Sequence, residues 1–396
     1  MTVGTRRRAA IVVLDGVGVG AAPDAASYGD VGSDTLAHVC EAAGGLSLPN
    51  FERWGLGCLA ALCGVPPVAS PAAAWGRMRP ASAGKDSTTG HWEIAGVRLE
   101  RPFPTYPDGF PTSLLHGFAE ATGRGVIGNV VGSGTAVVDA FGPEHERTGA
   151  WIVYTSADSV FQIAAHEAVI PLAELYAACT IARAMLVAPD DVSRVIARPF
   201  VGAAGAYRRT GNRRDYSVAP PAETLLDALA DADVPRHGVG KVDDLFAGRA
   251  ITACHTTGNA DGLARVEEWL AGAGEGLLFA NLVDFDALYG HRNDPAGFAA
   301  ALRTVDAAVP ALEVALRKDD LLFITADHGN DPTTPSTDHA REYVPLLARG
   351  IRVSAAPVGE RGTFADLGAT VAEWFDVAFV GTGTSFLPRL LDGASA

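Results

Sequence analysis

Three nearly continuous apolar segments of this chain each end in aspartate, and this repeated pattern restricts the possible fold more than any other feature. The segments are residues 9–14, 277–283 and 321–326, and the carboxylates that follow include Asp15, Asp286 and Asp327. Short apolar runs bounded by polar residues are typical of strands buried on both faces of a parallel sheet. Because open α/β sheets bind ligands beyond the carboxyl ends of their strands, we expect the three aspartates to share one sheet edge.

Histidines accompany these strand-end carboxylates, and together they indicate a metal centre. Carboxylate oxygen and neutral imidazole nitrogen are ligands for divalent cations, and the six candidates are Asp15, Asp286, His291, Asp327, His328 and His339. Six ligands exceed the need of one tetrahedral ion, but they suit two ions about 3.5–4 Å apart that act on a phosphate ester. These ligand types leave Mn²⁺, Zn²⁺ and Mg²⁺ open. The alternative, a turn with solvated side chains, requires three strands to share this ending by coincidence.

Residues 84–93, with the sequence GKDSTTGHWE, combine glycines and hydroxyl side chains ahead of an apolar segment. This pattern predicts a loop that enters a helix, where backbone N–H groups and the helix dipole favour an anion. The order of lysine and hydroxyls differs from that of a P-loop. A hydroxyl of Ser87 or Thr88 is therefore a candidate nucleophile. A simple helix-capping role is the alternative.

The chain length of 396 residues favours two domains. Proline-rich stretches at residues 101–111 and 220–221 predict the junctions, and strands alternate with helix between them. We therefore expect a metal-binding core of residues 1–101 and 218–396, with residues 102–217 inserted as a smaller α/β domain. The inserted segment carries a group of arginines that suits an anionic ligand, unless it is only a solvated basic face: Arg194, Arg198, Arg209 and Arg213.

The formal net charge of −15 argues against nucleic acid or anionic membrane as a partner. No apolar run approaches the roughly 18 residues of a membrane span. The apolar run from Ala9 to Leu14 is also too short for a signal peptide, so we expect a cytoplasmic protein. The sequence leaves the oligomeric state open.

Five motifs of the chain together resemble the phosphopentomutase family of the alkaline phosphatase superfamily. The Asp-His-Gly ending of the last motif marks only the superfamily, whereas the second and third are specific to the mutases. The motifs are VLDGVG at residues 13–18, GKDSTTGHWE at 84–93, YTSADS at 154–159, VDFDALYGHR at 283–292 and TADHGND at 325–331.

The resemblance implies an alkaline phosphatase-like α/β core with a mainly parallel central sheet flanked by helices, and a smaller inserted α/β cap. It implies one metal site from Asp286, His291 and His339, and a second from Asp15, Asp327 and His328. It places the nucleophile, which also binds metal, at Ser87, where many relatives have threonine; the alignment of Lys85 and Asp86 favours Ser87 over Thr88. The implied cofactors are two divalent ions, Mn²⁺ before others, and an activating sugar bisphosphate.

The implied activity is an isomerase reaction that interconverts α-D-ribose 1-phosphate, or its 2-deoxy analogue, with the 5-phosphate. It passes through a phosphorylated Ser87 and a sugar 1,5-bisphosphate, under a cap that excludes water. Small pentose phosphates are then the partners, and the expected contacts to them come from Asp158, Ser156, Arg194, Arg198, Arg209, Arg213 and Lys241. Asp284 and Asp338 are expected to orient the imidazole ligands.

Two rival functions follow from the same residues. One is another enzyme of the superfamily, such as a cofactor-independent phosphoglycerate mutase, a phosphatase or a phosphodiesterase. The other is a binding protein without activity, which the full set of six ligands and a hydroxyl nucleophile disfavours.

Overall fold

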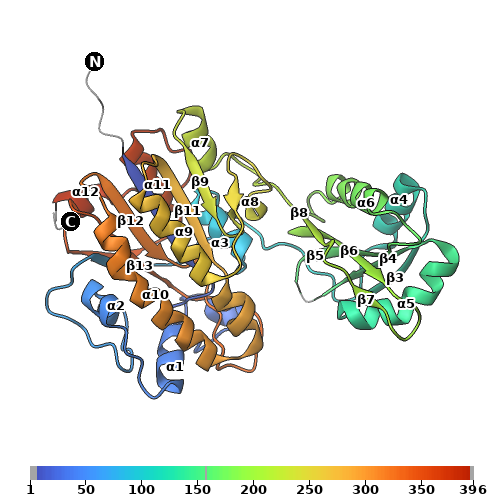
Figure 1. Cartoon of the computed structure of the whole chain (residues 1–396), viewed down its shortest axis with the longest axis horizontal. Helices are drawn as coiled ribbons and strands as arrows, with labels where there is room; N and C mark the ends of the chain where they lie inside the picture. The colour runs from blue at the N-terminus through green and yellow to red at the C-terminus, as the bar shows by residue number, and fades with distance from the viewer. Residues whose placement is uncertain (1–6, 157, 393–396) are drawn as a thin grey trace. The chain divides into compact units, whose positions relative to one another are not determined.

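The computed structural model describes residues 7–156 and 158–392, and the chain divides into two compact units (Figure 1). The core unit comprises Met1–Pro102 and Pro220–Ala396, and the inserted unit comprises Phe103–Ala219. The chain therefore leaves the core once and returns once. Each unit has its own sheet and its own apolar interior.

The described part of the core unit is built on an eight-stranded sheet. Strand β13 pairs antiparallel with both of its neighbours, whereas all the other pairings of this sheet are parallel. In spatial order the strands are β10 (Ala253–Cys254), β9 (Arg236–Val239), β11 (Gly276–Leu282), β1 (Arg8–Leu14), β12 (Asp320–Thr325), β13 (Val344–Arg349), β2 (Ala74–Met78) and β14 (Pro357–Arg361).

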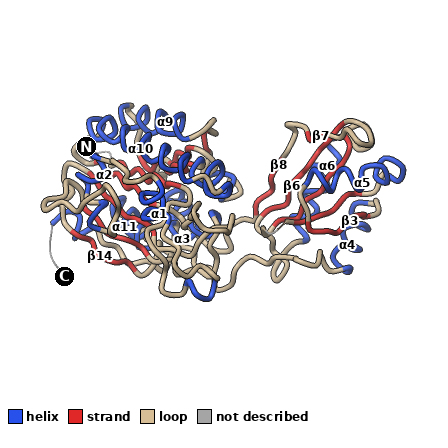
Figure 2. Tube along the Cα trace, turned by 90° about the horizontal axis from the view of Figure 1, so that it is seen from below, coloured by secondary structure: helices blue, strands red, loops and turns tan. Residues whose placement is uncertain are grey.

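Helices cover both faces of this sheet, which explains why the central strands are apolar throughout. Every residue of β1, β11 and β12 is buried. Figure 2 shows the layers: α9 and α10 lie on one side of the strands, and α3 and α11 lie on the other. None of the described helices is both long and apolar enough to cross a membrane. The core helices are α1 (Thr35–Ala42), α2 (Pro49–Trp54), α3 (Ser87–Ile94), α7 (Leu225–Asp231), α8 (Val242–Leu245), α9 (Asn259–Ala271), α10 (Pro295–Ala315), α11 (Ala365–Phe375) and α12 (Leu387–Asp392).

The inserted unit is a second α/β sandwich with a mixed sheet. One face packs through Trp151, Phe161 and Val195 among helices α4 and α6, and the other packs through Tyr154 and Phe200 against α5. The strands run in the order β3 (Val126–Val131), β4 (Trp151–Thr155), β5 (Val160–His166), β6 (Arg194–Val201) and β7 (Arg208–Arg209), and β8 (Arg214–Ser217) also pairs with β6. The helices are α4 (Thr112–Thr122), α5 (Gly134–Thr148) and α6 (Leu172–Met185).

The structure thus confirms the predicted fold class, a mixed α/β fold on a mainly parallel central sheet. Strand β13 begins at Val344, shortly after the loop that carries His339. Its antiparallel direction was not predicted.

Candidate active site

The three strand-end aspartates lie together because their strands are neighbours in register. Strand β1 is central, with Leu14 paired to Leu282 of β11 and Val13 paired to Thr325 of β12. All three chains therefore leave the sheet at the same edge. The buried carboxylates of Asp15, Asp286 and Asp327 follow these strand ends within four residues.

The residues of the first predicted metal site lie close together. Asp286 lies in the π-helical turn Phe285–Tyr289 that follows β11. Its two carboxylate oxygens lie 3.1 Å from His291 Nε2 and 3.4 Å from His339 Nε2. One ligand atom from each of the three residues falls within 4.8 Å of the other two, so a single ion has room to bind all three.

The second group of ligand atoms differs in one residue from the second predicted site. Asp15, Asp286 and His328 form a second group within 4.8 Å, so Asp286 belongs to both groups. Asp327 was expected in this site but lies outside that group. Its Oδ1 accepts the N–H of Gly16 at 3.1 Å, and its buried Oδ2 lies 3.1 Å from His91 Nδ1 and 3.5 Å from His328 Nε2.

Ser87 is the hydroxyl that the structure brings to these ligands. Its Oγ donates to Asp15 Oδ1 at 3.2 Å and lies 3.1 Å from His328 Nε2. Ser87 is the first residue of α3, whose N-cap Asp86 accepts the N–H of Thr89. The backbone N–H groups of this helix end face outward from the helix, where an anion is favoured.

Charges at the site are strongly coupled. Burial opposes ionisation of Asp286, but attraction to His339 and hydrogen bonds with His291 and His339 lower its pKa well below the usual value. The pKa of His291 rises to about 9 because the Asp286 hydrogen bond and charge outweigh burial. The pKa of His328 is also raised, against burial, by the charges of Asp327 and Asp15.

These shifts, together with the two groups of ligand atoms, indicate that the residues fit divalent cations. The carboxylates draw protons onto imidazoles that would otherwise be neutral, which shows that the site favours positive charge. The buried Asp327 Oδ2, which lies between the imidazoles of His91 and His328, also suits a cation. Metal binding would release the imidazole protons and take over their electrostatic role.

Two amides that the sequence analysis missed orient the carboxylate ligands. Asn281 Nδ2 donates to Asp15 Oδ2 at 2.9 Å, and Asn330 Nδ2 donates to Asp286 Oδ1 at 2.7 Å. Of the two carboxylates expected to orient imidazoles, Asp338 Oδ1 lies 3.6 Å from His339 Nδ1. The expectation for Asp284 was wrong, because its carboxylate instead accepts the N–H of Asn259 at the start of α9.

The candidate substrate residues of the inserted unit form two groups. Ser156 Oγ donates to the exposed Asp158 Oδ2 at 3.4 Å, and residue 157 of the same motif lies outside the described residues. Three of the arginines line a cavity of about 220 Å³: Arg198, Arg209 and Arg213. Arg194 lies 3.6 Å from Asp215, which also pairs with Arg213 at 2.6 Å. Lys241 belongs to the core unit, where it is exposed and precedes α8.

Comparison with known proteins agrees with this geometry at two levels. A family model of the metalloenzyme superfamily matches residues 7–378, so the fold and the site define a metal-dependent enzyme of that superfamily. The phosphopentomutase of Anaeromyxobacter sp. (strain K) is 57% identical over 386 residues, which cover 97% of this chain and 99% of that protein. The phosphopentomutase of Dictyoglomus thermophilum is 53% identical over 389 residues, with 98% and 99% covered.

The chain therefore belongs to the phosphopentomutase family, a family of isomerases. Among solved structures, Leishmania mexicana phosphoglycerate mutase is similar in fold, with a TM-score of 0.52 at 13% identity. That match covers 96% of this chain and 98% of the other.

Proposed function

We propose that the protein interconverts α-D-ribose 1-phosphate, or its 2-deoxy analogue, and the corresponding 5-phosphate through a phosphorylated Ser87. The observation that carries this proposal is the position of Ser87 Oγ, within 3.2 Å of both Asp15 Oδ1 and His328 Nε2. A hydroxyl in contact with two candidate metal ligands at a helix N-terminus suits a group that accepts and returns a phosphoryl group.

The proposed reaction has two transfers. Phosphoserine 87 gives its phosphoryl group to the free 5-hydroxyl of ribose 1-phosphate, whose proton leaves, and this yields the 1,5-bisphosphate and a free Ser87 hydroxyl. The bisphosphate then turns over, and Ser87 Oγ takes the phosphoryl group from C1 while the C1 oxygen gains a proton. The products are ribose 5-phosphate and the regenerated phosphoserine, so atoms balance without another reactant.

Divalent ions bound at the site would neutralise charge on the transferring group and lower the pKa of a bound hydroxyl. Mn²⁺ is proposed from the family resemblance, and the mixed carboxylate and imidazole ligands are compatible with it. We assign one ion to Asp286, His291 and His339, and the other to Asp15, Asp327, His328 and Ser87, with Asp286 close enough to Asp15 and His328 to serve both ions. The protein residues align Ser87: Asp86 caps its helix, and His91 Nδ1 lies 2.9 Å from the Ser87 carbonyl oxygen.

The inserted unit is proposed to recognise the rest of the substrate. Asp158 and Ser156 suit sugar hydroxyls, and Arg194, Arg198, Arg209 and Arg213 suit the phosphate that is not reacting. Lys241 of the core unit is proposed to contact the same phosphate. A mutase must keep water from the phosphoserine, and a cap over the site would do so. An activating sugar bisphosphate would phosphorylate Ser87 initially. The cytoplasmic location expected from the sequence stays a prediction.

The experiment that tests this proposal combines phosphosite mapping with a coupled assay. Wild type, Ser87→Ala and Thr88→Ala are loaded with Mn²⁺, and isomerisation of ribose 1-phosphate and release of inorganic phosphate are measured together. We expect phosphate on Ser87, and loss of isomerisation only in Ser87→Ala. Inorganic phosphate without isomerisation in wild type would overturn the mutase mechanism in favour of hydrolysis, and phosphate on Thr88 would overturn the assignment of Ser87.

A further inference from the structure

Arg341 lies two residues after His339 and contacts the loop that leads to Ser87. Its side chain is 3% exposed. The guanidinium donates to the carbonyl oxygens of Ser82 at 2.6 Å, Gly84 at 2.7 Å and Pro80 at 3.1 Å. These are alternate residues of the segment between β2 and α3, so one side chain holds the backbone of this whole approach to the nucleophile.

The other contacts of Arg341 keep the guanidinium in one place. It pairs with Asp24 at 2.9 Å and lies 4.6 Å from the ring of Tyr28, whose hydroxyl donates to the carbonyl of Ala83 in the same loop. The backbone N–H of Arg341 donates to Asp30, which also accepts from Lys85. Segment 24–30 therefore holds Arg341 and the loop together.

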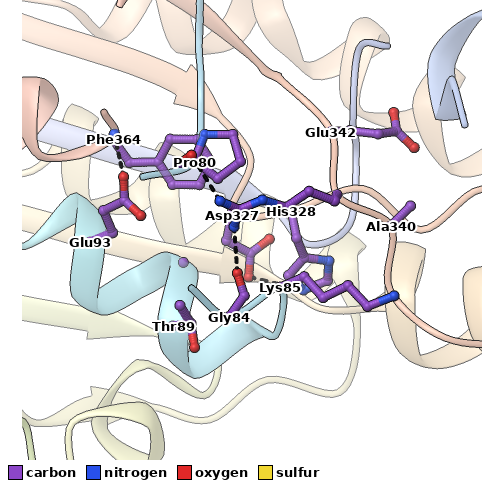
Figure 3. A pocket seen from close by; sticks show the side chains of 12 residues that line it. Pro80, Gly84, Lys85, Thr89, Glu93, Asp327, His328, Ala340, Glu342 and Phe364 are labelled. Carbon is purple, nitrogen blue, oxygen red and sulfur yellow. Dashed lines mark hydrogen bonds and ion pairs between the residues drawn. The ribbon is translucent and has the colours of Figure 1, made fainter. Parts of the chain in front are cut away.

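The loop is also anchored from its helical side. Glu93, near the end of α3, accepts the N–H groups of Ala81 at 2.8 Å and Ser82 at 2.7 Å. Figure 3 shows Glu93 and Gly84 on the wall of a small pocket, opposite Ala340 and Glu342. The pocket volume is only about 10 Å³, roughly the space of one water molecule, so the loop has little room to shift.

The backbone around Arg341 is joined to the metal-ligand loop as well. Gly329 and Ala340 exchange two hydrogen bonds, at 3.1 and 2.7 Å, directly between His328 and Arg341 along the chain. Arg341 therefore connects the loop carrying His328 and His339 to the loop carrying Ser87, and a more exposed ion pair of Lys85 with Asp338 at 3.2 Å joins the same loops. Its charge-assisted bonds to carbonyl oxygens in a buried setting are stronger and more directional than neutral ones.

We propose that Arg341 is a positioning residue that sets the Ser87 hydroxyl against Asp15 and His328. This inference rests on the proposed role of Ser87. Phosphoryl transfer depends almost entirely on positioning and electrostatics, and a displacement of about 1 Å costs roughly 10²-fold in rate. Arg341 touches no reacting atom, so its effect is exerted through the backbone of residues 80–84.

The test compares Arg341→Met and Arg341→Lys with Arg8→Lys and Arg8→Met. Arg8 is a matched control, because it is 1% exposed, pairs with the buried Asp320 and lies at the opposite end of β1 from Asp15. For each Mn²⁺-loaded variant, kcat and KM for ribose 1-phosphate, melting temperature and the rate of Ser87 phosphorylation are measured.

We expect kcat and the phosphorylation rate of Arg341→Met to fall roughly 10²-fold with KM changed less than threefold. Arg341→Lys should recover part of kcat, because an ammonium group can donate to some of the same carbonyls. The Arg8 variants should lose a comparable amount of thermal stability but retain kcat.

Two different outcomes would contradict the positioning role of Arg341 and the proposed role of Ser87. If Arg341→Met keeps kcat within threefold of the Arg8 variants while Ser87→Ala is inactive, Arg341 has only a structural role. If Ser87→Ala itself keeps full isomerase activity, the proposed role of Ser87 fails, and the positioning role of Arg341 falls with it.

Discussion

The charged residues of the core site and those of the inserted unit are held in opposite ways. In the core, Asp15, Asp327 and His328 are at most 4% exposed. The two carboxylates accept hydrogen bonds from an amide side chain and a backbone N–H, and His328 Nδ1 lies 3.1 Å from the Gly329 carbonyl oxygen. In the inserted unit, Arg209 and Arg213 are exposed and contact neighbours on the same surface, such as Thr135 and Asp215. The difference teaches that the groups proposed to react are rigidly buried, whereas the arginines proposed to bind the substrate phosphate are exposed.

Substitution of Asp286 should give the largest effect, because it is the one carboxylate shared by both metal groups. Asp286→Asn removes a negative charge that faces His291 and His339, so we expect both ions to be lost and isomerisation to fall to background. Metal content after dialysis and calorimetric titration with Mn²⁺ measure this directly. Asp243→Asn is the control, since Asp243 belongs to a separate, partly exposed group with His255. Two tightly bound ions in Asp286→Asn would contradict the shared role.

Asn330 provides a sharper test of rigid burial. Its amide donates to Asp286 Oδ1 without being a candidate metal ligand, so Asn330→Ala should weaken metal affinity by roughly 10–100-fold. Excess Mn²⁺ should then restore most of the activity, unlike in Asp286→Asn. Activity measured across a Mn²⁺ titration distinguishes the two. A variant with unchanged Mn²⁺ dependence would show that the amide does not tune the ligand.

The carboxylates and histidines of the core could be predicted because their signal is local. An apolar run followed by aspartate implies a strand end, and parallel strands bring such ends to one edge. Asn281 and Asn330 carried no such signal: Asn281 interrupts an apolar strand, and Asn330 follows a motif whose acidic and histidine residues account for the metal chemistry. Their partners are 266 and 44 residues away, so only the register of the folded sheet reveals them.

The strands of the core sheet were also predictable from local sequence. The direction of β13 was not, because it depends on contacts between distant residues. Continuous apolar runs identified β1, β11 and β12, but the direction of β13 depends on the path of the loop that carries His339. Asp327 was grouped with Asp15 from the motif alone. In the structure a hydrogen bond from Gly16 orients the Asp327 carboxylate, and Asp286 joins Asp15 and His328 as a ligand that the sequence had placed in the other site only.

In the inserted unit we expect smaller effects, confined to substrate binding. Arg198 donates to Gln162 at 2.9 Å and lines the arginine cavity, so Arg198→Met should lose a charge-assisted bond to phosphate worth about 1.5–3 kcal/mol. That loss corresponds to roughly a 10–100-fold increase in KM, with kcat and metal affinity retained. Arg147→Met is the control, because Arg147 is 73% exposed on the same unit. A fall in kcat at unchanged KM would contradict the proposal that the core site performs the chemistry and the inserted unit only binds the substrate.

The smallest effect should come from Glu342, a buried acid behind the metal loops. Burial raises its pKa to about 8, although it accepts hydrogen bonds from the N–H and hydroxyl of Thr35. The Glu342 side chain packs directly against the backbone of Gly18 and Gly329, because a Cβ at either glycine would lie within 2.5 Å of it. At neutral pH we therefore expect a protonated carboxyl, which glutamine resembles in size and charge.

The pH dependence of Glu342→Gln follows from linkage. The unfolded chain releases this proton near the ordinary pKa of 4.5, whereas the folded chain keeps it to about pH 8. Between these values the native state binds more protons, so the unfolding free energy of wild type should fall relative to Glu342→Gln as pH rises, and level off above about pH 8. Melting temperatures from pH 5 to about pH 9, taken as differences between the two proteins, cancel titrations that both share. Parallel curves would mean that Glu342 is ionised in the fold, and that the N–H groups of Thr35 and Gly20 stabilise a buried charge there.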